Sequence, residues 1–137
     1  MVSVLVCGRF DPLHDGHILH ILQAAALGDY LIIVTHTDEV IDKIKPQGHQ
    51  IPLWARMASL RGLLDHYHIE GEVRLSIDDD GTVIKTLTRI RPDILAKGGD
   101  RTPDNMPQGE IDMCEEIGCR IIYGIGSQLN SSSKIMM

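Results

Sequence analysis

Aromatic residues, cysteines and basic residues are all scarce in this sequence, and each shortage excludes something. Aromatic side chains make up only 4% of the 137 residues, so aliphatic side chains must fill the core. The three cysteines, Cys7, Cys114 and Cys119, form no C-x-x-C motif, so we expect reduced thiols in a cytosolic protein. Thirteen basic against 19 acidic residues argue against nucleic-acid binding, but not against a phosphate-rich ligand in a locally positive pocket.

Long hydrophobic runs are missing as well. The apolar stretches have the length of strands, so no segment is expected to span a membrane, and residues 1–7 lack the pattern of a signal peptide. Hydrophobic residues nevertheless make up 43% of the chain, which is typical of a globular protein. Without repeats or long linkers, residues 1–137 are predicted to form one domain in the cytoplasm.

Short apolar runs alternate with amphipathic segments along the chain. Strands are predicted at residues 2–7, 30–35, 73–77, 93–96 and 120–123, and helices at residues 16–27, 38–45, 52–66, 82–90, 109–117 and 131–136. This alternation predicts an α/β fold, a Rossmann-like, doubly wound parallel sheet of five strands with helices on both faces. Ligands of such sheets bind beyond the carboxyl ends of the strands, so we expect the site in the segments after Cys7 and Ala96.

Residues 8–17, G-R-F-D-P-L-H-D-G-H, lie between the first predicted strand and the first predicted helix. A helix start offers unpaired N–H groups and the positive end of a dipole, and glycines let a backbone approach phosphate closely. His14 and His17 are three residues apart, so both point to one side of the helix entrance and can donate to phosphate oxygens. The alternatives are two solvated histidines or a metal pair with His20, which would be turned about 120° from His14.

This segment resembles the G-x-F-D-x-x-H-x-G-H signature of the cytidylyltransferase-like nucleotidyltransferase superfamily. The matching residues are Gly8, Phe10, Asp11, His14, Gly16 and His17. The resemblance implies that the backbone near Arg9 and Phe10, together with both histidines, contacts the triphosphate of a nucleotide. At the position of Arg9, the sugar- and glycerol-phosphate enzymes commonly have threonine or cysteine. An arginine there resembles the motif of the archaeal nicotinamide mononucleotide adenylyltransferases, so the motif alone does not identify the substrate.

Three further segments are similar to motifs of the same superfamily. Residues 97–100, K-G-G-D, follow the fourth predicted strand and resemble bacterial heptose-phosphate adenylyltransferase domains. Residues 130–135, N-S-S-S-K-I, partly match I-S-T-T-x-I, and residues 54–60, W-A-R-M-A-S-L, partly match E-x-R-x-x-x-L. Taken without the resemblance, the three segments are also compatible with a tight turn, a polar tail and a surface arginine, and Lys45 with a solvated lysine.

The resemblance assigns roles to individual residues. His14, His17 and Lys97 are expected to be catalytic, and Asp11, Lys45 and Arg56 to bind the acceptor. The nucleotide is expected to contact Gly8, Arg9, Phe10, His14, Asp15, Gly16, His17, Gly98, Asp100, Ser131, Ser132 and Ser133. No metal site made by the protein alone is expected, because Mg²⁺ would bridge the phosphates.

These features predict in-line attack by a substrate phosphate oxygen on the α-phosphate of a nucleoside triphosphate, with release of pyrophosphate. The resemblance favours a homodimer that transfers an adenylyl group from ATP to a sugar phosphate, as in lipopolysaccharide or sugar-nucleotide biosynthesis. Cytidylyl transfer from CTP to glycerol 3-phosphate and adenylyl transfer to flavin mononucleotide remain open.

Two functions of other classes are weaker hypotheses. The intact histidine pair speaks against an inactive nucleotide-binding module, and nothing visible in the sequence activates a thiolate for redox sensing. If His14 and His17 act mainly on the transition state, replacing either by alanine should lower kcat roughly 10²–10³-fold. Such replacements are expected to leave folding unaffected.

Overall fold

The computed structural model describes residues 1–126, which form five strands and five helices. The strands are β1 (Ser3–Cys7), β2 (Tyr30–Thr35), β3 (Gly71–Leu75), β4 (Ile94–Gly98) and β5 (Arg120–Ile125). The helices are α1 (Asp15–Ala25), α2 (Asp38–Ile44), α3 (Leu53–His66), α4 (Ile84–Ile90) and α5 (Gln108–Ile117). Every predicted element within residues 1–126 is confirmed, and the helical turn predicted at residues 131–136 lies outside the described residues.

The ends of the elements differ from the predictions by one or a few residues. β3 begins two residues before its apolar run, because parallel pairing with β2 extends to Gly71 and Glu72. At Gly71 the strands approach so closely that a Cβ atom would collide with the carbonyl of Leu31. Tertiary pairing therefore decides where this strand starts, whatever the polarity of its residues.

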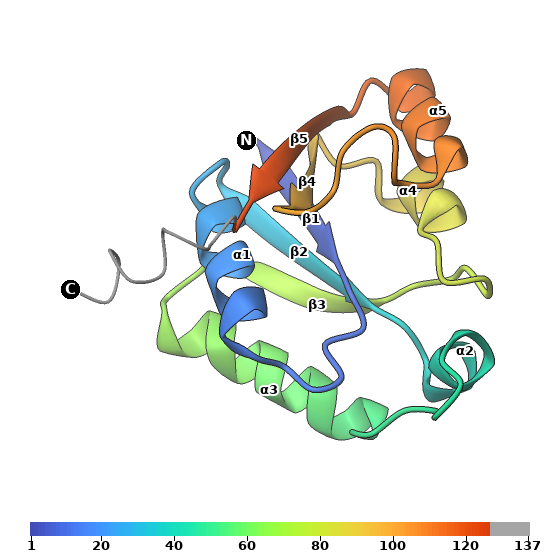
Figure 1. Cartoon of the computed structure of the whole chain (residues 1–137). Helices are drawn as coiled ribbons and strands as arrows, with labels where there is room; N and C mark the ends of the chain where they lie inside the picture. The colour runs from blue at the N-terminus through green and yellow to red at the C-terminus, as the bar shows by residue number, and fades with distance from the viewer. Residues whose placement is uncertain (127–137) are drawn as a thin grey trace.

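All five strands are parallel and form one sheet in the order β3-β2-β1-β4-β5. The chain builds outward from β1 through β2 and β3, then returns to the other side of β1 to add β4 and β5. The strand order thus reverses between β1 and β4, and the loops that leave these two strands diverge there (Figure 1). This confirms that the segments after Cys7 and Ala96 meet at one edge of the sheet.

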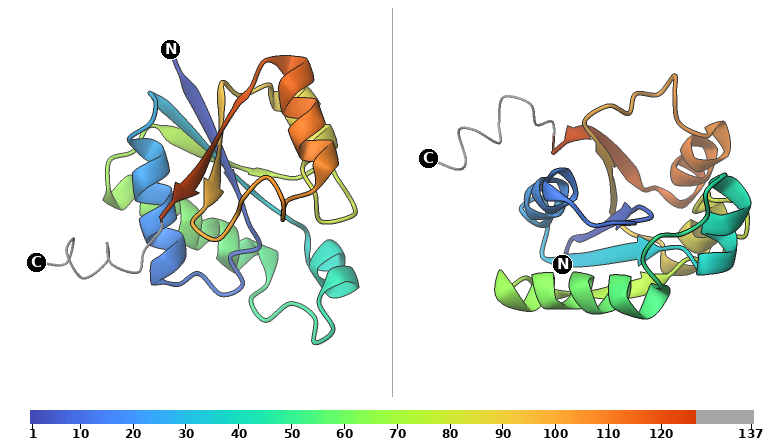
Figure 2. Two further views of the ribbon diagram at one scale, coloured as in Figure 1. Left: turned by 45° about the horizontal axis from the view of Figure 1, so that its top comes forward. Right: turned by 60° about the horizontal axis from the view of Figure 1, so that its bottom comes forward.

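Helices cover both faces of the sheet, as predicted (Figure 2). Successive side chains of a strand point to opposite faces, so Val4 and Val6 pack with α1 and α3 whereas Leu5 packs with α4 and α5. These buried residues are aliphatic almost throughout, which is consistent with the low aromatic content. Among residues 1–126, no helix is long and apolar enough to cross a lipid bilayer.

Candidate active site

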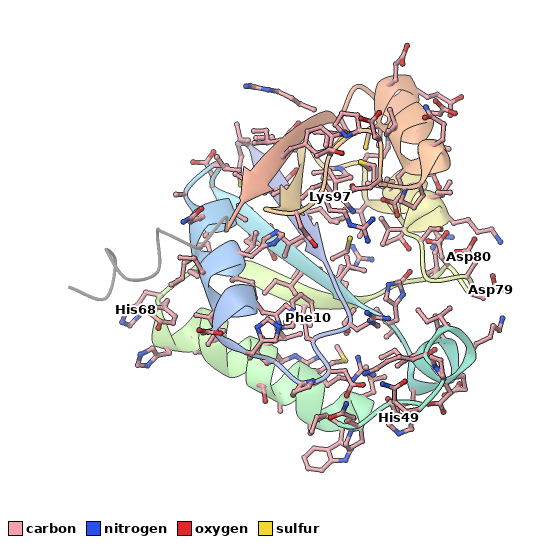
Figure 3. The ribbon with its side chains drawn as sticks, in the orientation of Figure 1. Phe10, His49, His68, Asp79, Asp80 and Lys97 are labelled. Atoms are coloured by element: carbon pink, nitrogen blue, oxygen red, sulfur yellow. The ribbon has the colours of Figure 1, made fainter. Side chains whose placement is uncertain are left out.

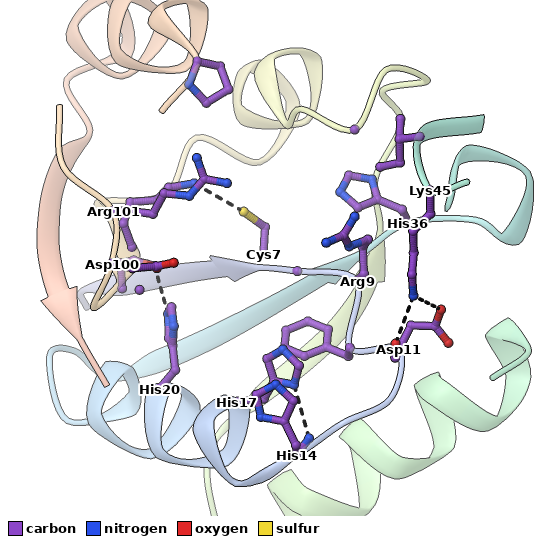
Figure 4. Close-up of a pocket in the computed structure, with 18 of the residues that line it drawn as sticks. Cys7, Arg9, Asp11, His14, His17, His20, His36, Lys45, Asp100 and Arg101 are labelled. Carbon is purple, nitrogen blue, oxygen red and sulfur yellow. Dashed lines mark hydrogen bonds and ion pairs between the residues drawn. The ribbon is translucent and has the colours of Figure 1, made fainter. Parts of the chain in front are cut away.

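A pocket of about 510 Å³ opens at the carboxyl edge of the sheet, where β1 and β4 part. Its wall is formed by the loop after β1, the start of α1, and the segments that follow β2 and β4 (Figure 4). Of the predicted site residues, it brings together Gly8, Arg9, Phe10, Asp11, His14, His17, Lys45, Lys97, Gly98 and Asp100. Asp15, Gly16 and Arg56 do not line it, and Ser131, Ser132 and Ser133 lie outside the described residues.

The two histidines of the motif stack on each other at the start of α1, with ring centroids 3.8 Å apart. The Gly16 N–H donates to Nδ1 of His14 over 3.1 Å, and the His14 N–H donates to Nδ1 of His17 over 3.2 Å. Because Nδ1 is the acceptor in both rings, a neutral ring carries its proton on Nε2. Each histidine therefore offers the pocket an Nε2–H donor, in a tautomer fixed by the backbone.

The electrostatic environment keeps His17 neutral. Burial lowers the pKa of His17 to about 4, and the nearby charges of His14, His20 and Arg9 act in the same direction. The ring also makes an edge-to-face contact with Phe10, with centroids 5.0 Å apart. His17 is therefore a rigid, uncharged hydrogen-bond donor near pH 7, rather than a cation.

The helix start itself differs from the prediction. The first N–H groups of α1 are not free, because the His14 ring caps them and His17 completes a capping box. Gly16 is needed there for another reason, since a Cβ atom would lie 3.0 Å from Cε1 of His14. The side chain of Asp15 is fully exposed and accepts from the Gly16 N–H over 2.9 Å. Asp15 and Gly16 do not line the pocket, and their expected nucleotide contacts stay a prediction.

The loop after β1 is anchored by Phe10, whose side chain is only 4% exposed and belongs to the core (Figure 3). Its φ of +51° is in the left-handed region, which non-glycine residues adopt at some cost in energy. Gly8 accommodates the ring, because a Cβ atom there would lie 3.1 Å from Cζ of Phe10. The Arg9 carbonyl accepts from Thr35 Oγ1 over 3.1 Å, while the Arg9 side chain is exposed at the pocket.

Arg56, which was expected to bind the acceptor, does not line the pocket. It is 2% exposed, and its guanidinium donates to the carbonyls of Ile51 and Arg9 over 3.0 and 3.2 Å. It also donates to Thr35 Oγ1 over 2.8 Å and forms an ion pair with Asp38 over 2.7 Å. With these donors already engaged, Arg56 holds the β1 loop from behind instead of reaching into the pocket.

Asp11 also has a different task from the predicted one, because its carboxylate is buried and fully engaged. It accepts from the N–H groups of Gln50 and Ile51 and from Nζ of Lys45, the last over 3.1 Å. Burial by itself would raise the pKa of Asp11, but these three partners outweigh it and hold that pKa below its usual value. Asp11 therefore ties the loop before α3 to the motif and places Lys45 in the pocket wall.

Lys97, the residue before the end of β4, lines the pocket as predicted, but it is 8% exposed and paired with Glu110 over 3.2 Å (Figure 3). Burial alone would lower the pKa of Lys97, but its ion pair with the Glu110 carboxylate outweighs burial and helps to raise that pKa. Burial raises the pKa of the Cys7 thiol, so this cysteine is not an activated thiolate. Sequence reasoning missed Glu110, because an acid in the first turn of a helix is ordinarily an exposed partner of the helix dipole.

Two more histidines line the pocket, and sequence reasoning did not place either there. His20 donates from Nε2 to the Ala96 carbonyl over 3.1 Å, and its ring lies against Gly98. His36 follows β2 directly and is 4% exposed. The position of His36 directly after a parallel strand could have indicated this, because ligands bind beyond the carboxyl ends of parallel strands and this holds for β2 as it does for β1 and β4.

A resident metal site is not built into this part of the chain. Among residues 1–126, no three histidine, cysteine, aspartate or glutamate side chains are grouped so that they could hold a metal ion. The pocket is instead lined by basic and acidic side chains, of which Lys45 pairs with Asp11 and Lys97 with Glu110. The other charged side chains in its lining are Arg9, Arg101 and Asp100. An anionic ligand thus meets a small local excess of positive charge, although the whole chain carries −6.

Comparison with known proteins places this geometry in context. Residues 5–136 match the family model described as cytidylyltransferase-like. The chain is 37% identical over 108 residues to the bifunctional protein HldE of Vibrio vulnificus, covering 78% of this chain and 21% of that protein. It is 30% identical over 129 residues to HldE of Haemophilus ducreyi, covering 93% of this chain and 24% of that one. The chain therefore spans about a fifth to a quarter of these relatives.

Two solved structures are similar to this chain in fold. The lipopolysaccharide core biosynthesis protein of Thermoplasma volcanium superimposes with a TM-score of 0.69 at 24% identity, covering 90% of this chain and 93% of that one. Pantoate-beta-alanine ligase of Francisella tularensis superimposes with a TM-score of 0.56 at 15% identity, covering 89% and 57% of the two chains.

Proposed function

Because this chain belongs to the cytidylyltransferase-like family of nucleotidyltransferases, we propose that it transfers an adenylyl group from ATP to a phosphorylated small molecule. The observation that carries the proposal is the stacked pair of His14 and His17. Both rings present Nε2–H donors at one end of a pocket that also contains Lys97 and Arg9. Such preorganised donors, partly withdrawn from water, suit the charge that develops during phosphoryl chemistry.

In the proposed reaction, a phosphate oxygen of the acceptor attacks the α-phosphorus of the triphosphate in line. A new P–O bond forms, the bond between the α-phosphorus and the bridging oxygen breaks, and pyrophosphate leaves with that oxygen. The histidines donate hydrogen bonds to the α- and β-phosphates, so no side chain acts as a nucleophile. Magnesium enters with the triphosphate as part of the substrate and neutralises phosphate charge.

His17 takes this role as a neutral ring. A neutral ring gives up no proton to the substrate and acts only through its Nε2–H hydrogen bond. Lys97 adds charge, but its pairing with Glu110 limits how far it moves, so we assign it to a fixed phosphate oxygen. Lys45 and Arg9 are left for the phosphate of the acceptor.

The proposed acceptor is a sugar phosphate, supported by the K-G-G-D sequence at residues 97–100 and by the similarity to HldE proteins. The test is a matrix of four nucleoside triphosphates against phosphorylated acceptors, each with magnesium, read as pyrophosphate release. We expect release with ATP and a sugar phosphate. Release with CTP and glycerol 3-phosphate would identify the cytidylyltransferase reaction instead.

Controls separate chemistry from binding in this assay. The variant His17→Asn should abolish most turnover, whereas His66→Asn, at the exposed end of α3, should retain it. Calorimetry with ATP and CTP should show tighter binding of ATP. Binding without pyrophosphate release from any pair of substrates would reject transfer activity in favour of a nucleotide-binding module.

A further inference from the structure

His36 occupies a position that the proposed chemistry does not explain. Its ring lines the pocket just after the end of β2, on the same side as Lys45 (Figure 4). The residue is 4% exposed, and Nδ1 has no hydrogen-bond partner within residues 1–126. The ring of His20, in contrast, is fixed by the Ala96 carbonyl.

A buried ring nitrogen without a partner is rare in a folded protein, because it has given up water without a replacement. Here the ring that carries the unpartnered atom lines a pocket, so a small turn of the side chain would bring Nδ1 within reach of a ligand atom that supplies the missing hydrogen bond. Burial lowers the pKa of His36; Asp78 and Glu110 act to raise it, and Arg56 and Arg9 to lower it. The ring is therefore neutral, with one nitrogen as donor and the other as acceptor.

A hydroxyl group is the partner that fits Nδ1 in either tautomer, since it both donates and accepts. A phosphate or carboxylate only accepts, and an ammonium only donates, so each would fit one tautomer alone. The missing partner is therefore best matched by an alcohol.

The two ends of the pocket divide between the two substrates of the proposed reaction. His20 and Asp100 line one end, and His36 and Lys45 line the other, with His17 and Arg9 between them (Figure 4). In-line attack places the acceptor on the side of the α-phosphate opposite the leaving pyrophosphate. The expected nucleotide contacts lie at the first end, which leaves the end at His36 for the acceptor.

We propose that His36 is a specificity residue that binds a hydroxyl group of the acceptor, which is therefore a phosphorylated polyol or sugar. This inference rests on the proposed function for the division of the pocket. Lys45 and Arg9 hold the phosphate of the acceptor, while His36 recognises the hydroxyl-bearing carbon chain. Ile44 and Gly81 confine that chain, because a Cβ atom at Gly81 would lie 3.1 Å from Cδ1 of Ile44.

The experiment uses binding rather than turnover. The probes are glycerol 3-phosphate, ribose 5-phosphate, a hexose 1-phosphate and a hexose 6-phosphate, with n-propyl phosphate as the matched ester without hydroxyl groups. Calorimetry is run on the full chain, on His36→Leu and on His36→Asn, whose amide oxygen occupies the place of Nδ1. His66→Asn serves as the surface control, and melting curves establish that each variant is folded.

At least one hydroxylated ester should bind His36→Leu about tenfold more weakly than the unchanged chain, which corresponds to about 1.4 kcal/mol. His36→Asn should recover part of that affinity, and n-propyl phosphate should bind all variants equally. The ¹⁵N resonances of the His36 ring should shift with the hydroxylated ester and not with n-propyl phosphate.

Equal losses for both classes of ester, or unchanged affinity in His36→Leu, would overturn the proposal. So would a His36 ring whose ¹⁵N resonances respond to none of the hydroxylated esters, since water or nothing would then be its partner. The proposed function fails separately: selective binding through His36 with no pyrophosphate release from any substrate pair would keep the hydroxyl site and reject the transfer reaction.

Discussion

Replacing His17 by alanine and by asparagine should separate its structural contribution from its catalytic one. In the structure, Nδ1 accepts the His14 N–H and thereby caps α1, whereas Nε2–H is the donor left for the substrate. In asparagine, the amide oxygen occupies the place of Nδ1, but the side chain has no group at the place of Nε2. His17→Asn therefore keeps the cap and removes the donor, while His17→Ala removes both.

The expected magnitudes follow from these contacts. Loss of the capping hydrogen bond should cost about 1 kcal/mol, and loss of the contacts with Phe10 and His14 a further ~0.5–1.5 kcal/mol. His17→Ala should thus unfold about 2 kcal/mol more easily than the unchanged chain, and His17→Asn about 1 kcal/mol more easily. Both should lower kcat roughly 10²–10³-fold. The expectation that folding is insensitive to these histidines is therefore revised.

Urea denaturation gives the stabilities, and pyrophosphate release with the best substrate pair gives kcat, with His66→Asn as the control for both. If His17→Asn had both the turnover and the stability that His17→Ala lacks, the only role of the ring would be to cap the helix. Equal destabilisation by asparagine and alanine would show that Nδ1 contributes no cap.

Three further predictions concern the loop behind the pocket, its pH dependence and the end of the chain. Arg56→Met should destabilise the fold by roughly 3 kcal/mol or more in urea denaturation, since it removes the hydrogen bonds to the carbonyls of Ile51 and Arg9 and leaves the Asp38 carboxylate without its cation. Arg61→Met, an exposed control on the same helix, should change stability by less than about 0.5 kcal/mol. The hydrogen bond that His49 donates to the Asp42 carboxylate raises the pKa of His49, whereas burial lowers that of His17 to about 4. At pH 5.5, NMR should therefore find His49 charged and His17 neutral. Between about pH 6.5 and 4, the unfolded chain binds a proton at His17 that the folded chain does not, so His17 makes the free energy of unfolding fall as the pH falls. The contribution of His49 to the free energy of unfolding has the opposite sign: it is complete below the ordinary pKa of histidine and is lost as the pH rises through the pKa of His49 in the folded chain. Deleting residues 130–137, which include the predicted triphosphate contacts Ser131–Ser133, should change the melting temperature little. It should weaken ATP binding roughly 10²-fold or more, because two hydrogen bonds to charged phosphate would be lost. Unchanged ATP affinity would show that the serines do not bind ATP.

The sequence by itself determined the architecture and the centre of the site, because both depend on local patterns. Short apolar runs separated by amphipathic helices predict a parallel sheet, and the residues next to each other in the β1 loop and the start of α1 form the motif. Contacts within this motif span only two or three residues, as in the hydrogen bonds that join Gly16 to His14 and His14 to His17. Spacing along the chain is therefore enough to bring these groups together.

Only the tertiary structure decided which polar side chains face the pocket and which hold it up. Several partners of Arg56 and Asp11 lie tens of residues away in the sequence, as between Arg56 and Arg9 or Asp11 and Ile51, and nothing in the spacing predicts them. Sequence similarity assigned both residues to the substrate, but burial engages them with the protein. His36 is the reverse case: no motif around it points to the site, but the fold places its ring in the pocket wall with a buried, unpartnered nitrogen. A hydrogen bond is satisfied or left open by the three-dimensional packing of distant segments, and this packing is what a single sequence does not display.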